Sequence, residues 1–274
     1  MARPLDVMKA LSWGCGVQST TLAVMSALGD ADPLDVVITA DTGWERHATY
    51  EAREFYTAWL QERGMRVEIV SAGNIRRLGA VEHIHMPFFT SNGGPLLRKC
   101  TGYHKILPIK RRLRELAGYH ATQPPHPPAG TIELWLGISW DEWERMKKSR
   151  VKFIVHRWPL IEGKTTRNAC IDYLEAHDLP VPVKSACIGC PYRQASEWAD
   201  MRDTSPDEWA EVVAFDEANR HNPLADRGKR SAGALFVYSR AKPLATADLD
   251  TDAARERRGK QPPLFVCEEG YCLV

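Results

Sequence analysis

The sequence has no long apolar run: no stretch approaches the roughly 18 residues that a membrane-spanning helix needs. It has almost no excess of charge either, since 36 Lys and Arg stand against 35 Asp and Glu. That balance argues neither for nor against a nucleic-acid partner. The N-terminus reaches Asp6 too early for a secretory signal peptide. These absences predict a cytoplasmic protein that does not associate with membranes.

An odd number of cysteines excludes complete pairing into disulfides. The seven are Cys15, Cys100, Cys170, Cys187, Cys190, Cys267 and Cys272. Without a secretory signal, a metal site or catalytic thiols explain them better than a disulfide framework.

The overall composition is that of an ordinary globular protein. Hydrophobic residues make up 44% and charged residues 26% of the 274 residues, which excludes collagen-like, coiled-coil and wholly disordered chains. The length suits one large domain, or one domain with a small appendage.

Strand-like and helix-like segments alternate along the first half of the chain. Strands are predicted at residues 7–12, 35–41, 66–72, 132–139 and 151–155, and helices at 18–28, 45–63 and 104–117. This order predicts an α/β fold, a Rossmann-like parallel sheet with helices on both faces, whose ligands bind beyond the carboxyl ends of the strands. We expect a nucleotide-binding domain at 1–163 and a mainly helical region at 164–274.

The helical region contains one strong helix start and one expected linker. Ser205 followed by Pro206 and two acids predicts a helix to about residue 220. Residues 250–263 are predicted to form an exposed linker, and four prolines predict a surface loop at 119–131.

The first predicted strand ends in a glycine-bearing turn that leads into a helix. Such a turn presents backbone N–H groups at the positive end of the helix dipole, where phosphate binds. It is not a Walker loop, because no Gly-Lys-Ser/Thr closes it, and its glycine spacing is not that of a dinucleotide fingerprint. The candidate nucleotide-binding residues here are Ser12, Trp13, Gly14, Gly16, Gln18, Ser19 and Thr20.

Two other strand ends carry small and polar residues. Asp41, Thr42 and Gly43 close the second strand, and Gly137 stands near the end of the fourth, shortly before Arg145. The three strand ends would form one crevice.

Together these motifs resemble the phosphoadenosine phosphosulfate (PAPS) reductase family of the PP-loop, or adenine nucleotide alpha-hydrolase, superfamily. The resemblance covers about residues 9–193. It rests on the first turn, on Asp41-Thr-Gly with Tyr50 on the next helix, on Arg98-Lys-Cys100 with Lys105 and Pro108, on Trp158-Pro-Leu-Ile161 with the following helix, and on Ser185-Ala-Cys187-Ile-Gly-Cys190. One departure is Gln18, which stands where the PP-loop usually has an aspartate.

The resemblance implies an adenine nucleotide, either ATP or a sulfonucleotide such as PAPS or adenosine phosphosulfate (APS), usually with Mg²⁺. It implies cleavage of ATP between the α and β phosphates, which needs donors around the phosphates and a positioned nucleophile. Asp41 is the candidate for contact with magnesium or ribose. Lys105, Arg145 and Arg150 are candidates for the phosphate or sulfate end.

Cys187 and Cys190 form a C-x-x-C pair that is compatible with zinc, an iron–sulfur cluster or a redox pair. The resemblance to APS reductases implies a [4Fe–4S] cluster, with Cys100, Cys187 and Cys190 as ligands and either an open fourth iron or closure by Cys267 or Cys272. Thr101 and Arg193 stand where that pattern would have further cysteines. Zinc, or no metal, remains open. Cys15 and Cys170 are interpreted as packing residues.

The resemblance leaves three functions open. The first is ATP-dependent, AMP-forming sulfur transfer with a sulfur donor protein and DNA or tRNA as acceptor, the basic segment 98–114 contacting phosphates or only flanking the nucleotide. The second is a sulfonucleotide reductase, in which Cys272 or Cys267 of the tail attacks sulfur and a thioredoxin-like reductant resolves the adduct. The third is a nucleotide-binding partner subunit without turnover. A homodimer is one expected assembly.

Overall fold

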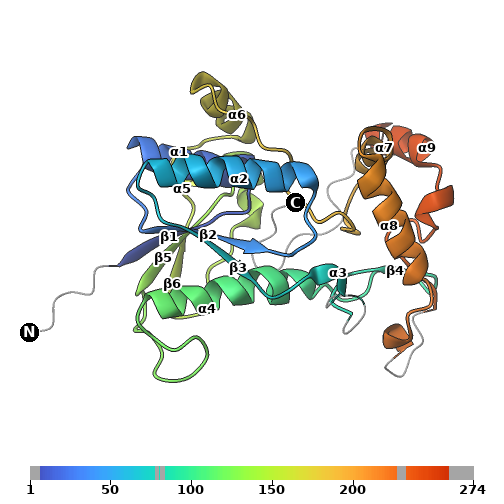
Figure 1. Cartoon of the computed structure of the whole chain (residues 1–274), viewed down its shortest axis with the longest axis horizontal. Helices are drawn as coiled ribbons and strands as arrows, with labels where there is room; N and C mark the ends of the chain where they lie inside the picture. Colours follow the sequence, from blue (N-terminus) through green and yellow to red (C-terminus); the bar gives the residue numbers. More distant parts are fainter. Residues whose placement is uncertain (1–6, 78–79, 81–83, 227–232, 259–274) are drawn as a thin grey trace, which may run out of the picture.

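The computed structural model describes residues 7–77, 80, 84–226 and 233–258. Its main sheet has five parallel strands in the order β3-β2-β1-β5-β6 (Figure 1). The strands are β1 (Met8–Ser12), β2 (Val36–Asp41), β3 (Val67–Ser71), β5 (Ile132–Leu136) and β6 (Ile154–Arg157). The predicted fold class is confirmed.

Side chains of each central strand alternate between two apolar layers. In β1, Leu11 points to the layer that holds α1 (Val17–Leu28), α2 (His47–Glu62) and α6 (Arg167–Ala176). Its neighbour Ala10 points to the opposite layer, which is closed by α4 (Leu107–Leu116). Because successive strand residues face opposite sides and both sides are covered, the strands read as near-continuous apolar runs. Figure 1 shows α1 and α2 on one face of the sheet and α4 on the other.

A third apolar cluster lies beside the carboxyl ends of the strands. It contains α7 (Ala195–Thr204), α8 (Pro206–Ala218) and α9 (Leu249–Arg258), and it takes in Trp44 and Cys187. The short elements are α3 (Ile75–Arg77), β4 (Phe89–Thr90), α5 (Pro159–Glu162) and β7 (Leu235–Phe236), a π-helix at Gly102–Ile106 and 3₁₀ turns at Trp140–Arg145, Pro223–Asp226 and Leu244–Thr246.

One buried carboxylate anchors this C-terminal cluster. Asp216 is 1% exposed and accepts hydrogen bonds from the backbone N–H groups of Val237 (2.7 Å) and Leu244 (3.1 Å) and from the Arg220 guanidinium. The pairing of β4 with β7 connects the same region to the segment before the basic helix. The cluster therefore holds chain segments from both halves of the sequence.

Some predicted boundaries differ from those in the structure. The exposed linker predicted at 250–263 is wrong for its described part, because residues 249–258 form α9, which packs on α7. The strand predicted at 151–155 is β6, which lies slightly later, at Ile154–Arg157. The domain division at residue 163 stays a prediction, although α6 packs on α1 and so lies with the α/β layers. The helix predicted after Ser205 is confirmed as α8.

No helix in the described part of the chain is long and apolar enough to cross a membrane.

Candidate functional site

The first loop (residues 13–16) turns sharply from β1 into α1. Cys15 adopts a left-handed conformation, with φ of 59°. The Gly14 N–H donates to Ser19 Oγ at 3.2 Å, and Gly16 caps α1 without a side-chain hydrogen bond. The first N–H groups of α1 therefore have no side-chain acceptor, and the helix dipole is directed at the same place. This is the geometry expected for an anion site.

Close contact with β5 fixes the position of this loop. A Cβ added to Gly137 would lie 2.6 Å from the backbone nitrogen of Ser19 and 2.7 Å from its Cα. Only glycine fits at that distance. Trp13 and Thr20 are buried and hydrogen-bonded to each other, with 3.0 Å between Nε1 and Oγ1. Trp13 and Thr20, which were predicted to contact the nucleotide, therefore stabilise the first loop from its buried side.

Beside the first turn of α1 is a cleft that we call the phosphate-side cleft. It is lined by Gly16, Gln18, Gly137, Glu142, Arg145, Arg167, Lys184 and Ser185. Gln18 connects two of its walls, since its amide donates to Glu142 (3.2 Å) and accepts from Arg167 (2.7 Å). Arg145 donates to the same Glu142 oxygen at 2.6 Å. Three cations from three separate segments therefore surround the amino end of α1.

Asp41, at the end of β2, already has partners for both of its carboxylate oxygens. Oδ1 accepts from the Gly43 N–H (2.7 Å) and from Tyr50 Oη (3.1 Å), and Oδ2 pairs with Arg53 (3.1 Å). Partial burial opposes ionisation, but the Gly43 N–H and Arg53 outweigh it and lower the pKa of Asp41. The carboxylate orders the start of α2.

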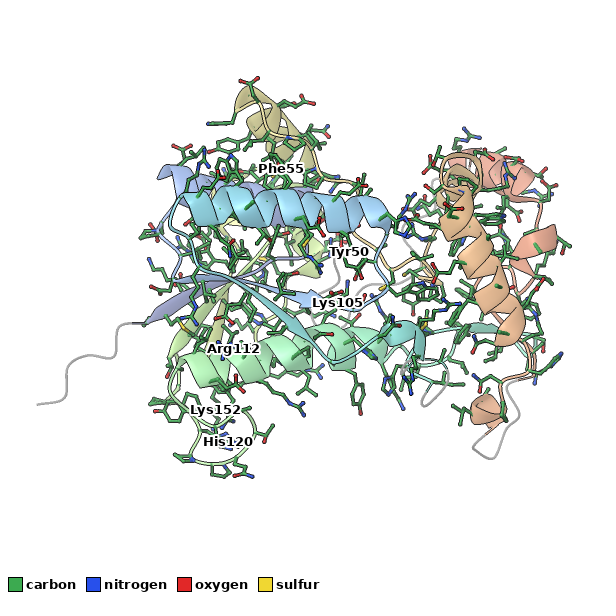
Figure 2. The ribbon with its side chains drawn as sticks, viewed as in Figure 1. Tyr50, Phe55, Lys105, Arg112, His120 and Lys152 are labelled. Carbon is green, nitrogen blue, oxygen red and sulfur yellow. The ribbon has the colours of Figure 1, made fainter. Side chains whose placement is uncertain are left out.

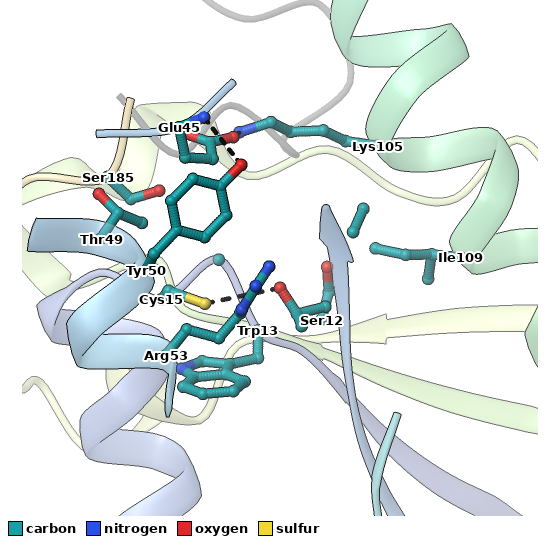
Figure 3. A pocket seen from close by; sticks show the side chains of 13 residues that line it. Ser12, Trp13, Cys15, Glu45, Thr49, Tyr50, Arg53, Lys105, Ile109 and Ser185 are labelled. Carbon is teal, nitrogen blue, oxygen red and sulfur yellow. Dashed lines mark hydrogen bonds and ion pairs between the residues drawn. The ribbon is translucent and has the colours of Figure 1, made fainter. Parts of the chain in front are cut away.

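A second pocket, the α2 pocket, lies between the first loop and α2. Its lining includes Ser12, Trp13, Ala40, Glu45, Tyr50, Arg53, Lys105 and Ser185 (Figure 3). Tyr50 from α2 and Lys105 from the π-helix before α4 enter the space between those helices (Figure 2). Because Ser185 lines both pockets, the phosphate-side cleft and the α2 pocket are adjacent.

A largely buried ion pair forms one wall of the α2 pocket. Lys105 Nζ lies 3.0 Å from Glu45 Oε1, and their side chains are 20% and 7% exposed. Burial alone would lower the pKa of Lys105, but the Glu45 carboxylate outweighs it and raises that pKa. Lys105 is therefore a permanent cation beside the first loop.

Backbone pairing brings the C-x-x-C segment to the end of β2. Glu45 bridges to Cys187, and the Ile188 N–H donates to the Trp44 carbonyl at 2.9 Å. A Cβ on Gly189 would lie 2.2 Å from the Trp44 ring, so the chain passes directly over the indole. Cys187 is thereby held beside the carboxyl end of β2.

Cys187 lies among polar groups although it is buried. Its Sγ is 3.4 Å from Thr42 Oγ1 and 3.6 Å from Glu45 Oε1. Burial, and then the Glu45 carboxylate, raise the pKa of this thiol well above its usual range. Cys190 follows in the same turn. Cys100 packs against the same cluster, and burial, with a smaller effect of Cys190, raises its pKa.

The three predicted ligand cysteines thus share one region, but they do not form a closed ligand set. Within residues 7–77, 80, 84–226 and 233–258, no group of three or more His, Cys, Asp or Glu is placed to hold a metal ion. Cys267 and Cys272 lie outside the described residues, so their predicted roles stay predictions. Cys15 and Cys170 are buried as expected, and burial raises the pKa of Cys15 to about 12.

Two arginines support the cysteine region. Arg193 is buried and donates to the carbonyls of Ala186, Cys187 and Ile188, which fixes the backbone on either side of Cys187. Arg98 hydrogen-bonds the Cys100 thiol, and its guanidinium lies 4.9 Å from the centre of the Tyr192 ring. The arginine that occupies a family cysteine position therefore has a structural role.

Much of the basic segment 98–114 is engaged within the chain. Arg112 pairs with Glu68 (2.7 Å), and Arg114 is buried and donates to the carbonyls of His120 and Gln123 in the proline-rich loop. Lys105 is bound to Glu45. These contacts account for several of its cations without a nucleic acid.

We expect the stability of the fold to decrease in acid because of His104, the residue before Lys105. Burial, and then neighbouring His85, lower its pKa to about 4 from an ordinary value near 6.5. The unfolded state therefore binds more protons between those values, and stability falls as pH falls from 6.5 to 4. We expect His104→Gln to reduce this loss by about 2 kcal/mol, measured by urea unfolding at pH 7 and pH 4.5. Exposed His177→Gln is the control; an unaltered acid dependence in H104Q would contradict the assignment.

Sequence reasoning missed several residues of both pockets. Glu45, Arg167 and Lys184 were not among its candidates, and Thr49 and Arg53 were taken only as parts of a helix. One local signal existed: residues 45, 49 and 53 recur at four-residue spacing after Asp41-Thr-Gly.

Comparisons with known proteins gave matches only among solved structures. No protein-family model and no curated protein matches the chain. A phosphoadenylyl-sulfate (PAPS) reductase from Candida auris in complex with phosphate is 12% identical, with a TM-score of 0.43 over 65% of this chain and 75% of that one. The U34-tRNA thiolase NcsA from Methanococcus maripaludis, with its [4Fe-4S] cluster, is 16% identical, with a TM-score of 0.44 over 89% of this chain and 84% of that one. The fold class itself rests on the parallel strand order and the two helical layers.

Proposed function

We propose that this chain is an adenine nucleotide-binding enzyme that catalyses ATP-dependent, AMP-forming sulfur transfer. The observation that carries the proposal is the convergence at one sheet edge of an uncapped helix N-terminus, three cations and a cysteine turn. The nucleotide phosphates would lie in the phosphate-side cleft, and Ser185 connects that cleft to Cys187, two residues later.

The chain supplies donors for the phosphates from several directions. The N–H groups of the first turn of α1 would contact one side, and Arg145, Arg167 and Lys184 the other, whereas the Ser19 hydroxyl is already bonded within the first loop. Such donors, fixed before the ligand arrives, stabilise charge that develops on a departing pyrophosphate. Glu142 accepts a hydrogen bond from Arg145 and Gln18 accepts one from Arg167, so both arginines are fixed in the lining of the cleft.

The residues do not fit magnesium held by Asp41. Both oxygens of Asp41 are occupied, and Gln18 offers a neutral amide where a carboxylate would be expected. Asp41 would have to release Arg53 to reach a cation. We propose instead that Arg145, Arg167 and Lys105 neutralise phosphate charge.

The cysteine region fits an iron–sulfur cluster in chemistry but not in arrangement. Thiolates are the ligands that such clusters prefer, and Lys105 and Arg98 supply positive charge nearby. The described cysteines do not lie as a closed set. Cys100, Cys187 and Cys190 remain the proposed ligands of a [4Fe–4S] cluster.

Release of pyrophosphate from ATP tests the proposed chemistry. We expect pyrophosphate and AMP to form in the presence of a sulfur donor, and Arg167→Ala to lower kcat/KM by about 100-fold, because the arginine would contact charge that develops in the transition state. Arg63→Ala, on the distal end of α2, is the control. Turnover without pyrophosphate would reject the AMP-forming reaction. Anaerobic purification with visible spectroscopy and metal analysis distinguishes an iron–sulfur protein from a zinc protein in the same preparation.

A sulfonucleotide reductase remains a second candidate because of one observation: neither Gln18 nor the engaged Asp41 provides a metal site for ATP cleavage. Such an enzyme would bind PAPS or APS in the same clefts, and a tail thiolate would attack the sulfur and displace the adenosine phosphate. A thioredoxin-like dithiol would then displace sulfite from the resulting S-sulfocysteine and be oxidised to a disulfide. Sulfite formation without pyrophosphate would favour it. Loss of that activity in Cys272→Ser or Cys267→Ser would identify the attacking thiol.

A further inference from the structure

The 3₁₀ turn at the rim of the phosphate-side cleft exposes large apolar side chains. Trp140, Trp143 and Met146 recur every three residues, which is the period of a 3₁₀ helix, and they are 43%, 54% and 36% exposed. Glu142 and Arg145 of the same turn bond to each other and line the cleft. Of the nine tryptophans in the chain, all of which the structure describes, only these two are exposed. Tryptophan is usually well buried, so a pair exposed in one turn indicates a contact surface.

Contacts on the cleft side hold this turn in place. The Trp140 N–H donates to the Thr165 carbonyl at 2.8 Å, and Asp141 accepts from the Arg167 N–H at 2.9 Å. The two indoles are therefore attached to a backbone that the start of α6 fixes. A contact surface ordered before its ligand arrives loses little conformational entropy on binding.

A run of basic residues continues from the tryptophans along the edge of the sheet. Residues 146–156 contain no acid and hold four cations, Lys147, Lys148, Arg150 and Lys152. The Lys147 carbonyl is 2.8 Å from the ring Nδ1 of His156 on β6, and the Lys152 carbonyl accepts from the Gly130 N–H, just before β5. The run therefore follows the edge strand β6 from the cleft toward the opposite end of the sheet, where Figure 2 places Lys152. We call residues 147–152 the basic strip.

The acids near this edge are engaged with other cations. Glu133 and Glu162 both pair with Arg157 of β6, at 3.4 Å and 3.0 Å. Lys148 and Lys152 are exposed, and neither forms an ion pair within the part of the chain that the structure describes. The strip therefore keeps its positive charge although the chain as a whole is almost neutral.

The two features together restrict the ligand. It must carry negative charge repeated along its length, for the strip, and flat rings, for the indoles. Single-stranded nucleic acid has both, because each nucleotide supplies a phosphate and a base whose face can stack on an aromatic ring. A duplex also carries phosphates, but its base faces are covered by their neighbours.

We propose that a single-stranded nucleic acid binds across Trp140 and Trp143, with its backbone along the basic strip. The bases stack on the two indoles, and the lysines and arginine of the strip contact successive phosphates. Because the tryptophans stand at the rim of the phosphate-side cleft, the bound strand passes its mouth. Only the role of this strand as the sulfur acceptor rests on the proposed function, since binding itself does not require turnover.

Fluorescence anisotropy with labelled DNA and RNA strands of about 12 nucleotides tests the surface. We expect a Kd of about 10 μM for a single strand near physiological salt, and about 10-fold weaker binding of the DNA duplex. Trp143→Ala should weaken strand binding about 10-fold, Trp143→Phe should restore most of it, and ATP binding should stay unchanged in both. Phe55→Ala removes an aromatic ring that is also 43% exposed, on α2, and is the control. A duplex bound as tightly as the strands, or wild-type affinity in W143A, would overturn stacking.

The salt dependence tests the basic strip separately. Lys152→Ala should reduce the slope of log affinity against log salt by about 0.7, the value for one phosphate of a single strand. Arg111→Ala, an exposed cation of the segment 98–114, should leave the slope unchanged. Failure of the wild type to bind either strand would overturn the proposal, and self-association that W143A abolishes would assign the surface to a second copy of the chain. Strand binding without ATP binding would instead reject the proposed function and leave this surface standing.

Discussion

Replacing Gly137 by alanine is expected to lower ATP affinity by about 100-fold, because even small displacements of a binding group have effects of this size. The new Cβ would lie 2.6 Å from the Ser19 nitrogen and 2.9 Å from the Ser19 Cβ. Two of the three nearest atoms are backbone atoms of the first turn of α1, and no rotamer change relieves the overlap. α1 would have to move away from β5, and the phosphate-side cleft would open along the wall formed by Gly137.

The same substitution should also destabilise the fold, by about 2–3 kcal/mol, the usual range for overpacking. Gly102→Ala is the matched control, because a Cβ at Gly102 meets nothing within 4 Å and the residue does not need a left-handed conformation. Nucleotide titration and urea unfolding of both variants separate the two effects. Near wild-type ATP binding in G137A would show that the phosphates do not lie at the first turn of α1.

The parts of the site that the sequence predicted are those formed by consecutive residues. The first loop, Asp41 with Gly43, and Gly137 all lie at strand ends that could be recognised from local apolar runs and turn residues. The parallel order of these strands then places them at one edge without any further information. Local pattern was therefore enough to place these residues at one edge of the sheet.

The parts that were missed depend on contacts between distant segments. Glu45 meets Cys187 across 142 residues, and Gln18 meets Arg167 across 149. No periodicity or motif encodes such a pairing, because each partner reads locally as an ordinary polar residue. The prediction that Asp41 would contact magnesium or ribose likewise could not take account of its pairing with Arg53.

The wrong prediction of a linker at residues 250–258 has a similar cause. The segment is rich in Asp and Arg and looks like a solvated linker, yet Leu249 and Ala253 are buried in the C-terminal cluster and residues 249–258 are helical. Tyr238 Oη donates to Asp252 at 2.8 Å and fixes one turn of that helix. Tertiary packing of one apolar edge was sufficient to order a charged helix.

Replacing Lys105 by methionine is expected to lower the free energy of unfolding by about 3 kcal/mol, because it leaves the Glu45 carboxylate buried without its cation. The carboxylate side chain is 7% exposed, and its only cationic partner among the described contacts is Lys105 at 3.0 Å. Glu45 holds the pKa of Lys105 above its ordinary value of about 10.4. The stabilisation is therefore complete below pH 10 and is lost only as pH rises beyond it. Denaturant unfolding at pH 7 measures it in full.

The double variant Lys105→Met with Glu45→Gln shows whether the loss of stability in K105M comes from the lost attraction or from the buried, unpaired carboxylate. If the cost comes from the unpaired carboxylate, neutralising Glu45 should recover most of it, and the cycle should give a coupling of about 2 kcal/mol. Lys9→Met, which breaks the exposed pair with Asp32, should cost less than about 1 kcal/mol. A loss in K105M no larger than in K9M would show that water reaches Glu45 freely. In that case the Glu45–Lys105 pair would not form a dry wall of the α2 pocket, so the stability cycle also tests how far that pocket excludes water.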